Sequence, residues 1–338
     1  MTVLLHSGHY HLIEKSGVGR AIRHQMKALE LNGIPYTTDP REPFDVIHIN
    51  TIFPESYFLG RKAKRQGKKV IYHAHSTEED FRNSFLFSNQ LSPLFKKWIS
   101  ICYASADLIV APTPYAKELL DGYGLGRPVV AVSNGIDLDF FKRNSEDAAC
   151  FRERFRLSRD DKAVISVGLT IERKGILDFV ELARRLPQYK FIWFGHTNLN
   201  TVPARVRAAV ETKLDNLLFA GYVPPEILKE AYSGSDLFLF PTYEETEGIV
   251  LLEALAMRLP VLIRDIPIYR NWLTDGVDVY KAADIGGFER KIQAILENEV
   301  PSLTEAGYRV AEERDLKIIG RQLAELQRAG PAQQTIPI

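Results

Sequence analysis

The sequence predicts an α/β protein built from two doubly wound domains that face a central cleft. Its 338 residues exceed what one small core usually needs, which favours two domains. Short apolar runs alternate with helical stretches throughout, a pattern typical of parallel sheets covered on both faces. The runs are TVLLHS, DVIHIN, KVIYHAH, DLIVAP and PVVAVS in the first half, and AVISVG, YKFIWFG, NLLFAG, DLFLFP and PVLIR in the second.

Polar and charged residues interrupt this alternation between about residues 140 and 160. We therefore expect one domain at 1–150 and another at 151–315, followed by a helix at 316–330 that packs back on the first domain. Ligands of parallel α/β sheets bind beyond the carboxyl ends of the strands. The cleft between the two domains is therefore the expected site.

The composition excludes several classes of protein. Lys and Arg together number 43, as do Asp and Glu, so the net charge gives no general attraction to nucleic acid. Cys102 and Cys150 lack metal-ligand spacing and are expected to be packing residues in a reducing compartment. The N-terminus has no signal-peptide pattern, and no window approaches the ~18 apolar residues of a membrane span. We expect a cytoplasmic protein that is soluble or peripheral to a membrane.

The segment EETEGIVLLEALA, residues 244–256, places acids at the end of a predicted buried strand. A helix is expected just after Gly248, and its free N–H groups would suit an anion. Glu253 falls in the apolar part of that helix, where a carboxylate needs a partner. Three acids lie before the helix: Glu244, Glu245 and Glu247. Two explanations stay open for them, since they either cap the helix or accept hydrogen bonds from sugar hydroxyls.

The spacing of Glu245 and Glu253 resembles the E-x7-E signature of the family 4 retaining glycosyltransferases. Other motifs of that family occur in the same order along the chain: SGVGR (16–20), SNGID (133–137) and VGLTIERKG (167–175). One departure is that Thr246-Glu247 replaces the family's Gly-Phe. The resemblance covers most of the chain and implies the GT-B fold, in which two Rossmann-like domains face a central cleft.

The resemblance also implies which residues act on a UDP-sugar. Negative charge grows on the diphosphate as the anomeric bond breaks, and Arg173 and Lys174 would stabilise it. Glu253 would hold the ribose hydroxyls, and Glu245 would position the donor sugar without acting as a nucleophile. The implied donor-binding residues are Gly17, Gly19, Gly168, Arg173, Lys174, Glu245, Gly248, Ile249 and Glu253. The implied catalytic residues are His75, Arg173, Lys174 and Glu245.

Two histidines follow the predicted strand VIY. Strand periodicity does not choose between His73 and His75, because residues two apart share one side of an extended chain. Only the resemblance favours His75 as the histidine near the donor sugar. Weaker candidates for the same cleft are Asn50, Glu78 and Asp80.

The resemblance implies no obligatory cofactor and no metal site. Asp137-Leu138-Asp139 has the form of a DxD metal motif, but it overlaps SNGID at the domain junction and is not expected to bind metal. Anionic lipid or Mg²⁺ is expected at most to stimulate the reaction.

A basic run and an amphipathic stretch indicate a membrane-binding face. RKAKRQGKK (61–69) has six basic residues in nine, and FRNSFLFSNQLSPLFKKWISICYA (81–104) interleaves aromatic residues and leucines with cations. Such surfaces suit the interface of an anionic bilayer. The alternative, a solvated helix beside a core helix, stays open. The candidate membrane or acceptor residues are Lys62, Lys64, Arg65, Phe85, Phe87, Phe95, Lys96, Lys97 and Trp98.

HSTEEDFRNSF (75–85) resembles the matching stretch of the bacterial diacylglycerol glycosyltransferases of Gram-positive bacteria. This resemblance implies transfer of glucose or galactose, with retention, from UDP-glucose or UDP-galactose to monoglucosyldiacylglycerol at the inner face of the plasma membrane. A soluble or polysaccharide acceptor is the first alternative, and a non-catalytic sugar-nucleotide-binding module is the second. A dehydrogenase is disfavoured because SGVGR lacks the full GxGxxG spacing.

Overall fold

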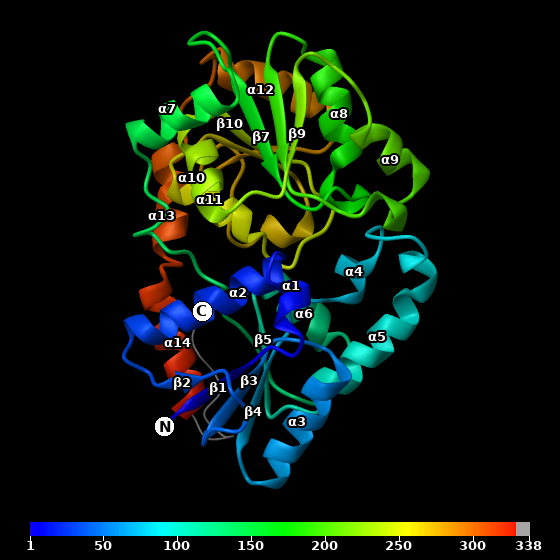
Figure 1. The fold of residues 1–338 in the computed structure, drawn as a ribbon, viewed down its shortest axis with the longest axis vertical. Coiled ribbons are helices and arrows are strands. Elements are labelled where there is room, and N and C mark those ends of the chain that lie inside the picture. Colours follow the sequence, from blue (N-terminus) through cyan, green and yellow to red (C-terminus); the bar gives the residue numbers. More distant parts are fainter. Residues whose placement is uncertain (329–338) are drawn as a thin grey trace.

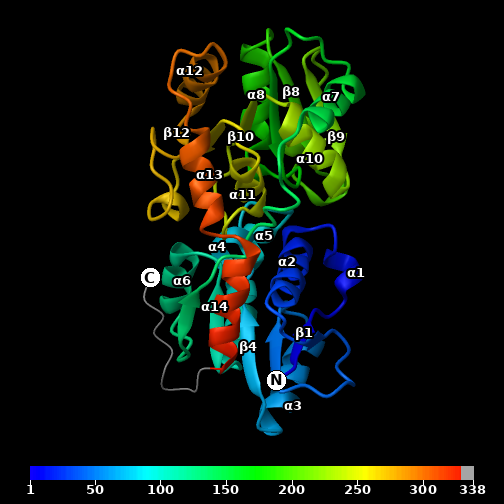
Figure 2. The ribbon, with the colours of Figure 1, turned by 90° about the vertical axis from the view of Figure 1, so that its left-hand side faces the viewer.

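The computed structural model describes residues 1–328 and shows two α/β domains stacked along the long axis of the molecule (Figure 1). The N-terminal domain, coloured blue to cyan, lies below the C-terminal domain, coloured green to orange. The last helix, in red, returns to the lower domain (Figure 2). The predicted fold class, two doubly wound domains, is confirmed.

Six parallel strands form the N-terminal sheet in the order β2-β1-β3-β4-β5-β6. They are β1 (Val3–His6), β2 (Tyr36–Thr37), β3 (Val46–Ile49), β4 (Lys69–His73), β5 (Leu108–Ala111) and β6 (Val129–Ala131). Alternate residues of these strands pack against helices on opposite faces, which is why the strands are almost wholly apolar. The helices are α1 (Tyr10–Ile13), α2 (Gly17–Leu31), α3 (Pro54–Arg65), α4 (Glu78–Phe81), α5 (Ser88–Ala104) and α6 (Pro114–Asp121).

The C-terminal sheet repeats this design with the strand order β12-β11-β10-β7-β8-β9. Its strands are β7 (Ala163–Val167), β8 (Lys190–Phe194), β9 (Leu217–Gly221), β10 (Leu237–Phe240), β11 (Val261–Arg264) and β12 (Tyr280–Ala282). One face packs on α8 (Ile176–Arg185), α9 (Ala204–Val210) and α12 (Ile285–Leu296). The other packs on α10 (Pro225–Gly234), α11 (Ile249–Ala256) and α13 (Thr304–Glu312).

The chain crosses between the domains twice, and the two crossings are hydrogen bonded to each other. Ile136, after β6, donates its N–H to the carbonyl of Arg314 at 2.9 Å, and Leu316 donates to the carbonyl of Ile136 at 3.1 Å. The expected boundary at 150/151 falls inside helix α7 (Ser145–Arg154). That helix packs on the C-terminal domain through the fully buried Phe151, so the domain begins before α7.

Helix α14 (Leu316–Arg328) lies on the N-terminal sheet beside α2. Its apolar stripe, formed by Ile319, Leu323 and Leu326, covers strands β3 to β6. The last two residues of the expected helix at 316–330 lie outside the described residues.

Two details differ from the sequence-based expectations. The edge strands β2 and β12 were not predicted, because two or three residues give no periodic signal. Cys102 is buried in the core, as expected of a packing residue, but Cys150 is exposed on α7. The expectation for Cys150 was therefore wrong.

Candidate active site

Loops that follow strands of both sheets meet between the domains, and most of the predicted site residues lie there. From the C-terminal domain come the 3-10 turn η1 (Glu172–Lys174) after β7 and residues 242–248 after β10. From the N-terminal domain come residues 75–84 after β4 and residues 133–135 after β6. This is the edge of the sheets where ligands of parallel α/β domains bind.

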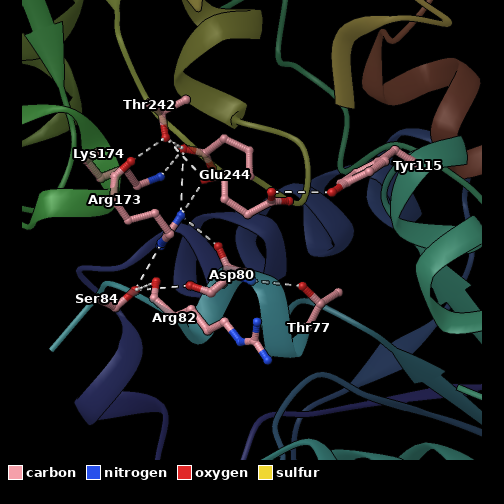
Figure 3. Close-up of polar contacts among 10 residues, drawn as sticks. Thr77, Asp80, Arg82, Ser84, Tyr115, Arg173, Lys174, Thr242 and Glu244 are labelled. Carbon is pink, nitrogen blue, oxygen red and sulfur yellow. Dashed lines mark hydrogen bonds and ion pairs between the residues drawn. The ribbon is translucent and has the colours of Figure 1, made fainter. Parts of the chain in front are cut away.

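Arg173 spans the two domains. Its Nη1 donates to Asp80 Oδ1 at 2.7 Å and to the carbonyl of Glu244 at 2.7 Å, and its Nε donates to Ser84 Oγ at 3.0 Å (Figure 3). Its backbone N–H donates to the carbonyl of Asn83. Asp80, a weaker candidate from the sequence, is thus a direct partner of Arg173, and Ser84 is a partner that no sequence signal marked.

Lys174 and Glu245 form a buried ion pair in the same cluster. Lys174 Nζ donates to Glu245 Oε1, which also accepts from Thr242 Oγ1 at 2.9 Å. Burial lowers the pKa of Lys174 and Glu245 opposes that effect. Gly175 lets the turn approach β10, since at its φ of +79° an added Cβ would lie 2.3 Å from the Pro241 carbonyl. Gly168 lies against the aliphatic stem of Lys174.

Glu253 has the partner that its apolar surroundings required. Its carboxylate is fully buried, forms an ion pair with Arg20 of α2 and accepts from the hydroxyl of Tyr232 at 2.9 Å. Burial raises the pKa of Glu253, and Arg20 opposes this shift. The pair therefore joins α2, which begins within SGVGR, to α11 across the domain interface.

The glycines of the first motif shape the start of α2. Ser16 caps the helix, accepting from the N–H of Gly19 at 3.4 Å. An added Cβ on Gly19 would lie 2.4 Å from the carbonyl of Ile13, so glycine is required there for close packing. Gly17 has open space around it.

Glu247 explains the departure from the family pattern. Its carboxylate accepts from Ser133 Oγ at 2.5 Å, and from the backbone and side chain of Asn134 at 3.0 and 2.7 Å. It therefore fastens the SNGID motif to the loop after β10. Gly248 follows in the left-handed conformation at φ 88° and begins α11, whose first residue is Ile249, as the sequence predicted.

Glu244 is one of the three acids for which the sequence left both helix capping and hydroxyl binding open. Its Oε2 accepts from Tyr115 of the other domain at 3.3 Å (Figure 3), and its buried Oε1 has no partner in the described part of the chain. Burial raises the pKa of Glu244 to about 7. Tyr115 carried no signal in the sequence, because a lone tyrosine on an amphipathic helix resembles core packing.

The two histidines after β4 have different surroundings. His73 is buried within the domain, between Gln25 and His48. His75 is half-buried, contacts Asn50 through Nε2 at 2.8 Å and has its pKa lowered to about 4 by burial. This contact with Asn50 keeps to the N-terminal domain and does not involve the Arg173 cluster. Glu78, another weaker candidate, turns away from the cluster to pair with Arg82 and Lys96.

The Asp137-Leu138-Asp139 segment forms a local turn. Asp137 Oδ1 accepts from the N–H groups of Asp139 at 3.2 Å and Phe140 at 3.1 Å, and Asp139 pairs with Lys317. Within residues 1–328, no group of three or more His, Cys, Asp or Glu side chains is arranged to hold a metal ion.

The predicted membrane residues divide into two groups. Four are tied into the domain: Phe95 stacks on Phe81, Trp98 donates to the carbonyl of Ile52, Lys96 pairs with Glu78, and Lys64 pairs with Asp107. Lys64 and Lys96 nevertheless leave 34% and 40% of their side chains exposed. The exposed ones are Lys62, Arg65, Phe85, Phe87 and Lys97.

An exposed apolar stripe runs along α5 and extends to α3. It is formed by Phe87, Leu91, Leu94 and Ile101 at helical spacing, with Phe58 on α3. Phe87, Leu94 and Phe58 each leave about two thirds of their surface exposed, at 69%, 67% and 67%. Among the helices of residues 1–328, none is long and apolar enough to span a bilayer.

Comparisons with known proteins agree with this geometry. Residues 39–140 match Glycosyltransferase Family 4, and residues 147–313 match Glycosyl transferases group 1. A processive diacylglycerol alpha-glucosyltransferase of Acholeplasma laidlawii is 42% identical over 96% of this chain and 97% of its own. An alpha-galactosylglucosyldiacylglycerol synthase of Streptococcus pneumoniae is 30% identical over 75% of this chain and 67% of its own.

Among solved structures, Anabaena HepE in complex with UDP and glucose superposes with a TM-score of 0.76 at 16% identity, covering 98% of this chain and 100% of that one. This likeness shows the fold, while the 42% identity to the A. laidlawii protein, over nearly all of both chains, shows the family. The chain therefore belongs to the GT-B glycosyltransferases that join a family 4 N-terminal domain to a group 1 C-terminal domain.

Proposed function

We propose that this glycosyltransferase moves glucose or galactose from a UDP-sugar to a glucosyl diacylglycerol, with retention of the anomeric configuration. The observation that carries the proposal is the convergence of Arg173, Lys174 and Glu245 at the interface of the two domains. The acceptor class comes from the relatives, since one is named a processive diacylglycerol glucosyltransferase and the other a galactosylglucosyldiacylglycerol synthase.

The cations in this cluster are suited to a diphosphate leaving group. Lys174 is largely buried and is held by Glu245, whose carboxylate also accepts from Thr242, so solvent screens its charge little. Arg173 is oriented by Asp80 and Ser84, so its side chain needs little rearrangement when negative charge develops on UDP. We infer that these side chains, rather than a resident metal, supply the positive charge. Activity that survives EDTA supports this, and complete loss that Mg²⁺ restores overturns it.

In the proposal, retention comes from acceptor attack on the face of the sugar that the phosphate leaves, and not from a covalent intermediate on Glu245. Its Oε1 is occupied by Lys174 and Thr242, so the carboxylate is held as a positioning group for donor hydroxyls and not as a free nucleophile. The leaving phosphate would then accept the proton of the acceptor hydroxyl on the same face of the sugar. Glu253 would offer the ribose hydroxyls an acceptor, exchanging its bond to Arg20 or Tyr232 for them.

The acceptor would reach the N-terminal domain from a membrane surface. The stripe of Phe87, Leu91 and Leu94 on α5 is exposed, and burying each such side chain contributes about 1.5–3 kcal/mol. The exposed cations Lys62 and Arg65 on α3 would add attraction to anionic lipid, about 1 kcal/mol each near the surface. The proposal places the protein peripherally on the inner face of the plasma membrane.

The test is to incubate the protein with radiolabelled UDP-glucose or UDP-galactose and anionic liposomes, with and without monoglucosyldiacylglycerol. We expect label in a diglycosyl lipid that depends on the acceptor and on one of the donors, and Lys174→Ala should form it about 10²- to 10³-fold more slowly. Labelled UDP release without labelled lipid contradicts the lipid acceptor and indicates a soluble one. Absence of both, from protein that binds neither donor, overturns the catalytic proposal.

A further inference from the structure

A line of buried amide and imidazole side chains runs beneath His75 through the N-terminal domain. Asn50 follows β3, Gln25 lies on α2, and His73 and His48 lie on the neighbouring strands β4 and β3. The line ends at Gln327, in the last turn of α14. All five side chains are buried, with exposures of 0–5%. The reaction proposed above uses none of them.

The members of this line, which we call the relay, lie within hydrogen-bonding distance of one another. Asn50 Oδ1 lies 2.8 Å from His75 Nε2, and Asn50 and Gln25 exchange two hydrogen bonds of 2.8 and 3.0 Å. Gln25 Nε2 lies 3.1 Å from His73 Nδ1, and His73 Nε2 lies 3.0 Å from His48 Nδ1. His48 Nε2 faces the amide of Gln327 at 3.3 Å.

The imidazoles in the relay are neutral, so each ring donates to one neighbour and accepts from the other, and all the hydrogen bonds run the same way. Burial lowers the pKa of His48 to about 3 and that of His73 well below its usual value. A neutral imidazole has one donor nitrogen and one acceptor nitrogen. Because Gln25 Nε2 donates to His73 Nδ1, the proton of His73 is on Nε2 and points to His48 Nδ1. The proton of His48 is then on its Nε2 and points to Gln327.

The end of the relay fixes this direction. With Gln327 Nε2 facing His48 Nε2, the N–H groups of both side chains would point at each other. In that orientation the buried Gln327 Oε1 also has no partner among the described residues. Turning the carboxamide by half a turn pairs Oε1 with the His48 proton and no longer sets two donors against each other. The reverse direction needs the amides of both Gln25 and Asn50 turned, and it leaves Gln327 Oε1 unpaired.

We propose that the residues of the relay are positioning residues for His75. Gln25 and Asn50, supported by the other three members, hold the proton of His75 on Nε2 and leave its Nδ1 as a hydrogen-bond acceptor. An acceptor nitrogen at that position suits a sugar hydroxyl, which donates its proton to Nδ1. The proposal deepens the proposed function and rests on it only in assigning the sugar as the group that His75 meets. Helix α14 thereby becomes part of the support of the site.

The direct test is the tautomer of each histidine, read from two-bond ¹H–¹⁵N correlations on the full-length protein labelled with ¹⁵N-histidine. We expect His48, His73 and His75 all to carry their proton on Nε2, with signals assigned from single His→Gln variants. A proton on Nδ1 of His75 or of His73 overturns the relay. The spectrum needs no substrate, so its result stands whether or not a lipid product is found.

Two matched substitutions at Gln327 test the far end. The carboxylate of Gln327→Glu only accepts, so we expect all three tautomers to be kept. Gln327→Leu removes the acceptor, and we expect the tautomer signals of His48 and His73 to shift or to divide between two forms. Identical spectra for wild type and Gln327→Leu overturn the assignment of Gln327 as the end of the relay.

Asn50→Leu tests the near end. We expect His75 to populate both tautomers and kcat to fall about tenfold or more, as when a partner that orients a functional histidine is lost, while KM for the UDP-sugar changes less than threefold. An unchanged tautomer in Asn50→Leu overturns the relay. If the tautomer changes but wild-type protein makes no glycolipid, the relay stands and the proposed function fails.

Discussion

At the scale of single residues, the site consists of charges that are buried and already paired. Glu253 with Arg20, and Lys174 with Glu245, lie where an unpaired charge would be costly. A ligand that enters must therefore replace these partners with groups of matching charge or hydrogen-bonding capacity. This requirement selects for a substrate carrying both hydroxyls and phosphates.

Replacing Glu253 should weaken donor binding. Hydrogen bonds to charged groups contribute about 1.5–3 kcal/mol, so Glu253→Gln should raise the Kd for UDP-glucose or UDP-galactose roughly 10- to 150-fold. Isothermal titration calorimetry measures this. Tyr232→Phe is the matched control, since it removes one of the carboxylate's partners and keeps the charge. Equal affinity of Glu253→Gln and wild type contradicts a role in ribose binding.

Replacing Lys174 should affect turnover more than binding. A cation that acts mainly on the charge of the transition state contributes to kcat, so Lys174→Ala should lower kcat about 10²- to 10³-fold with a smaller change in KM. Lys142→Ala, at an exposed lysine on the C-terminal side of the first crossing, serves as the control and should keep wild-type rates. A change confined to KM would show that Lys174 stabilises the bound donor and the transition state equally.

Glu244 should make stability depend on pH. Its pKa is raised to about 7 in the folded protein, so the folded state holds a proton there that the unfolded chain loses near pH 4.5. The stability that this proton contributes is complete below about pH 4.5 and is lost as the pH rises through 7. Urea unfolding at several pH values should show Glu244→Gln gaining stability relative to wild type over this range. A difference that is constant with pH contradicts the raised pKa.

The sequence predicted which residue types gather at the site but not all of their partners. Arg173, Lys174 and Glu245 meet, and each lies in a motif that the sequence displays. Their partners Ser84 and Tyr115 come from the other domain, and side-chain contacts between domains leave no periodic trace in a single sequence. Strand periodicity could not separate His73 from His75, because β4 ends at His73.

At the scale of elements, helix α5 shows why the membrane residues were only partly predicted. The stretch 81–104 is rich in apolar residues all round, so its composition does not reveal which side of the helix faces the core. In the structure Phe95 and Trp98 face the domain, while Leu91 and Leu94 face outward. The ten apolar runs, in contrast, all became strands, since each is short, apolar and bounded by turn residues.

Charging the outer side of α5 should release the protein from membranes. The double substitution Leu91→Glu with Leu94→Glu changes two exposed side chains, so we expect the fold to survive and binding to anionic vesicles to fall at least tenfold in a sedimentation assay. Val277→Glu, an equally exposed apolar position on the C-terminal domain, should bind like wild type. Vesicle binding that persists in the double variant contradicts α5 as the membrane face.

At the scale of the whole molecule, side chains from one domain hold the other. The ion pairs Arg20–Glu253 and Asp80–Arg173, together with the bonds of Glu247 to the SNGID motif, all cross the interface. The two crossings of the chain are themselves hydrogen bonded to each other. The structure is therefore a closed arrangement stabilised by the residues that are proposed to bind substrate.

Breaking one of these ion pairs should loosen the closed arrangement. Asp80→Asn removes the charge opposite Arg173, so the ligand-free protein should show a larger radius of gyration by small-angle X-ray scattering. Asp139→Asn, which affects only an exposed ion pair with Lys317, is the control and should leave that radius unchanged. Identical scattering from wild type and Asp80→Asn contradicts a role for this ion pair in closure.

The position of α14 has a consequence for how the protein is made. The strands β3 to β6 leave the ribosome well before the helix that covers one of their faces, because α14 lies far downstream in the chain. At about 5–20 residues per second, the roughly 180 residues between them take on the order of 10 to 40 s. Throughout that interval this face of the sheet lacks the helix that covers it in the folded protein. The N-terminal domain therefore completes its fold only after the strands and helices of the C-terminal domain up to α13 have been made.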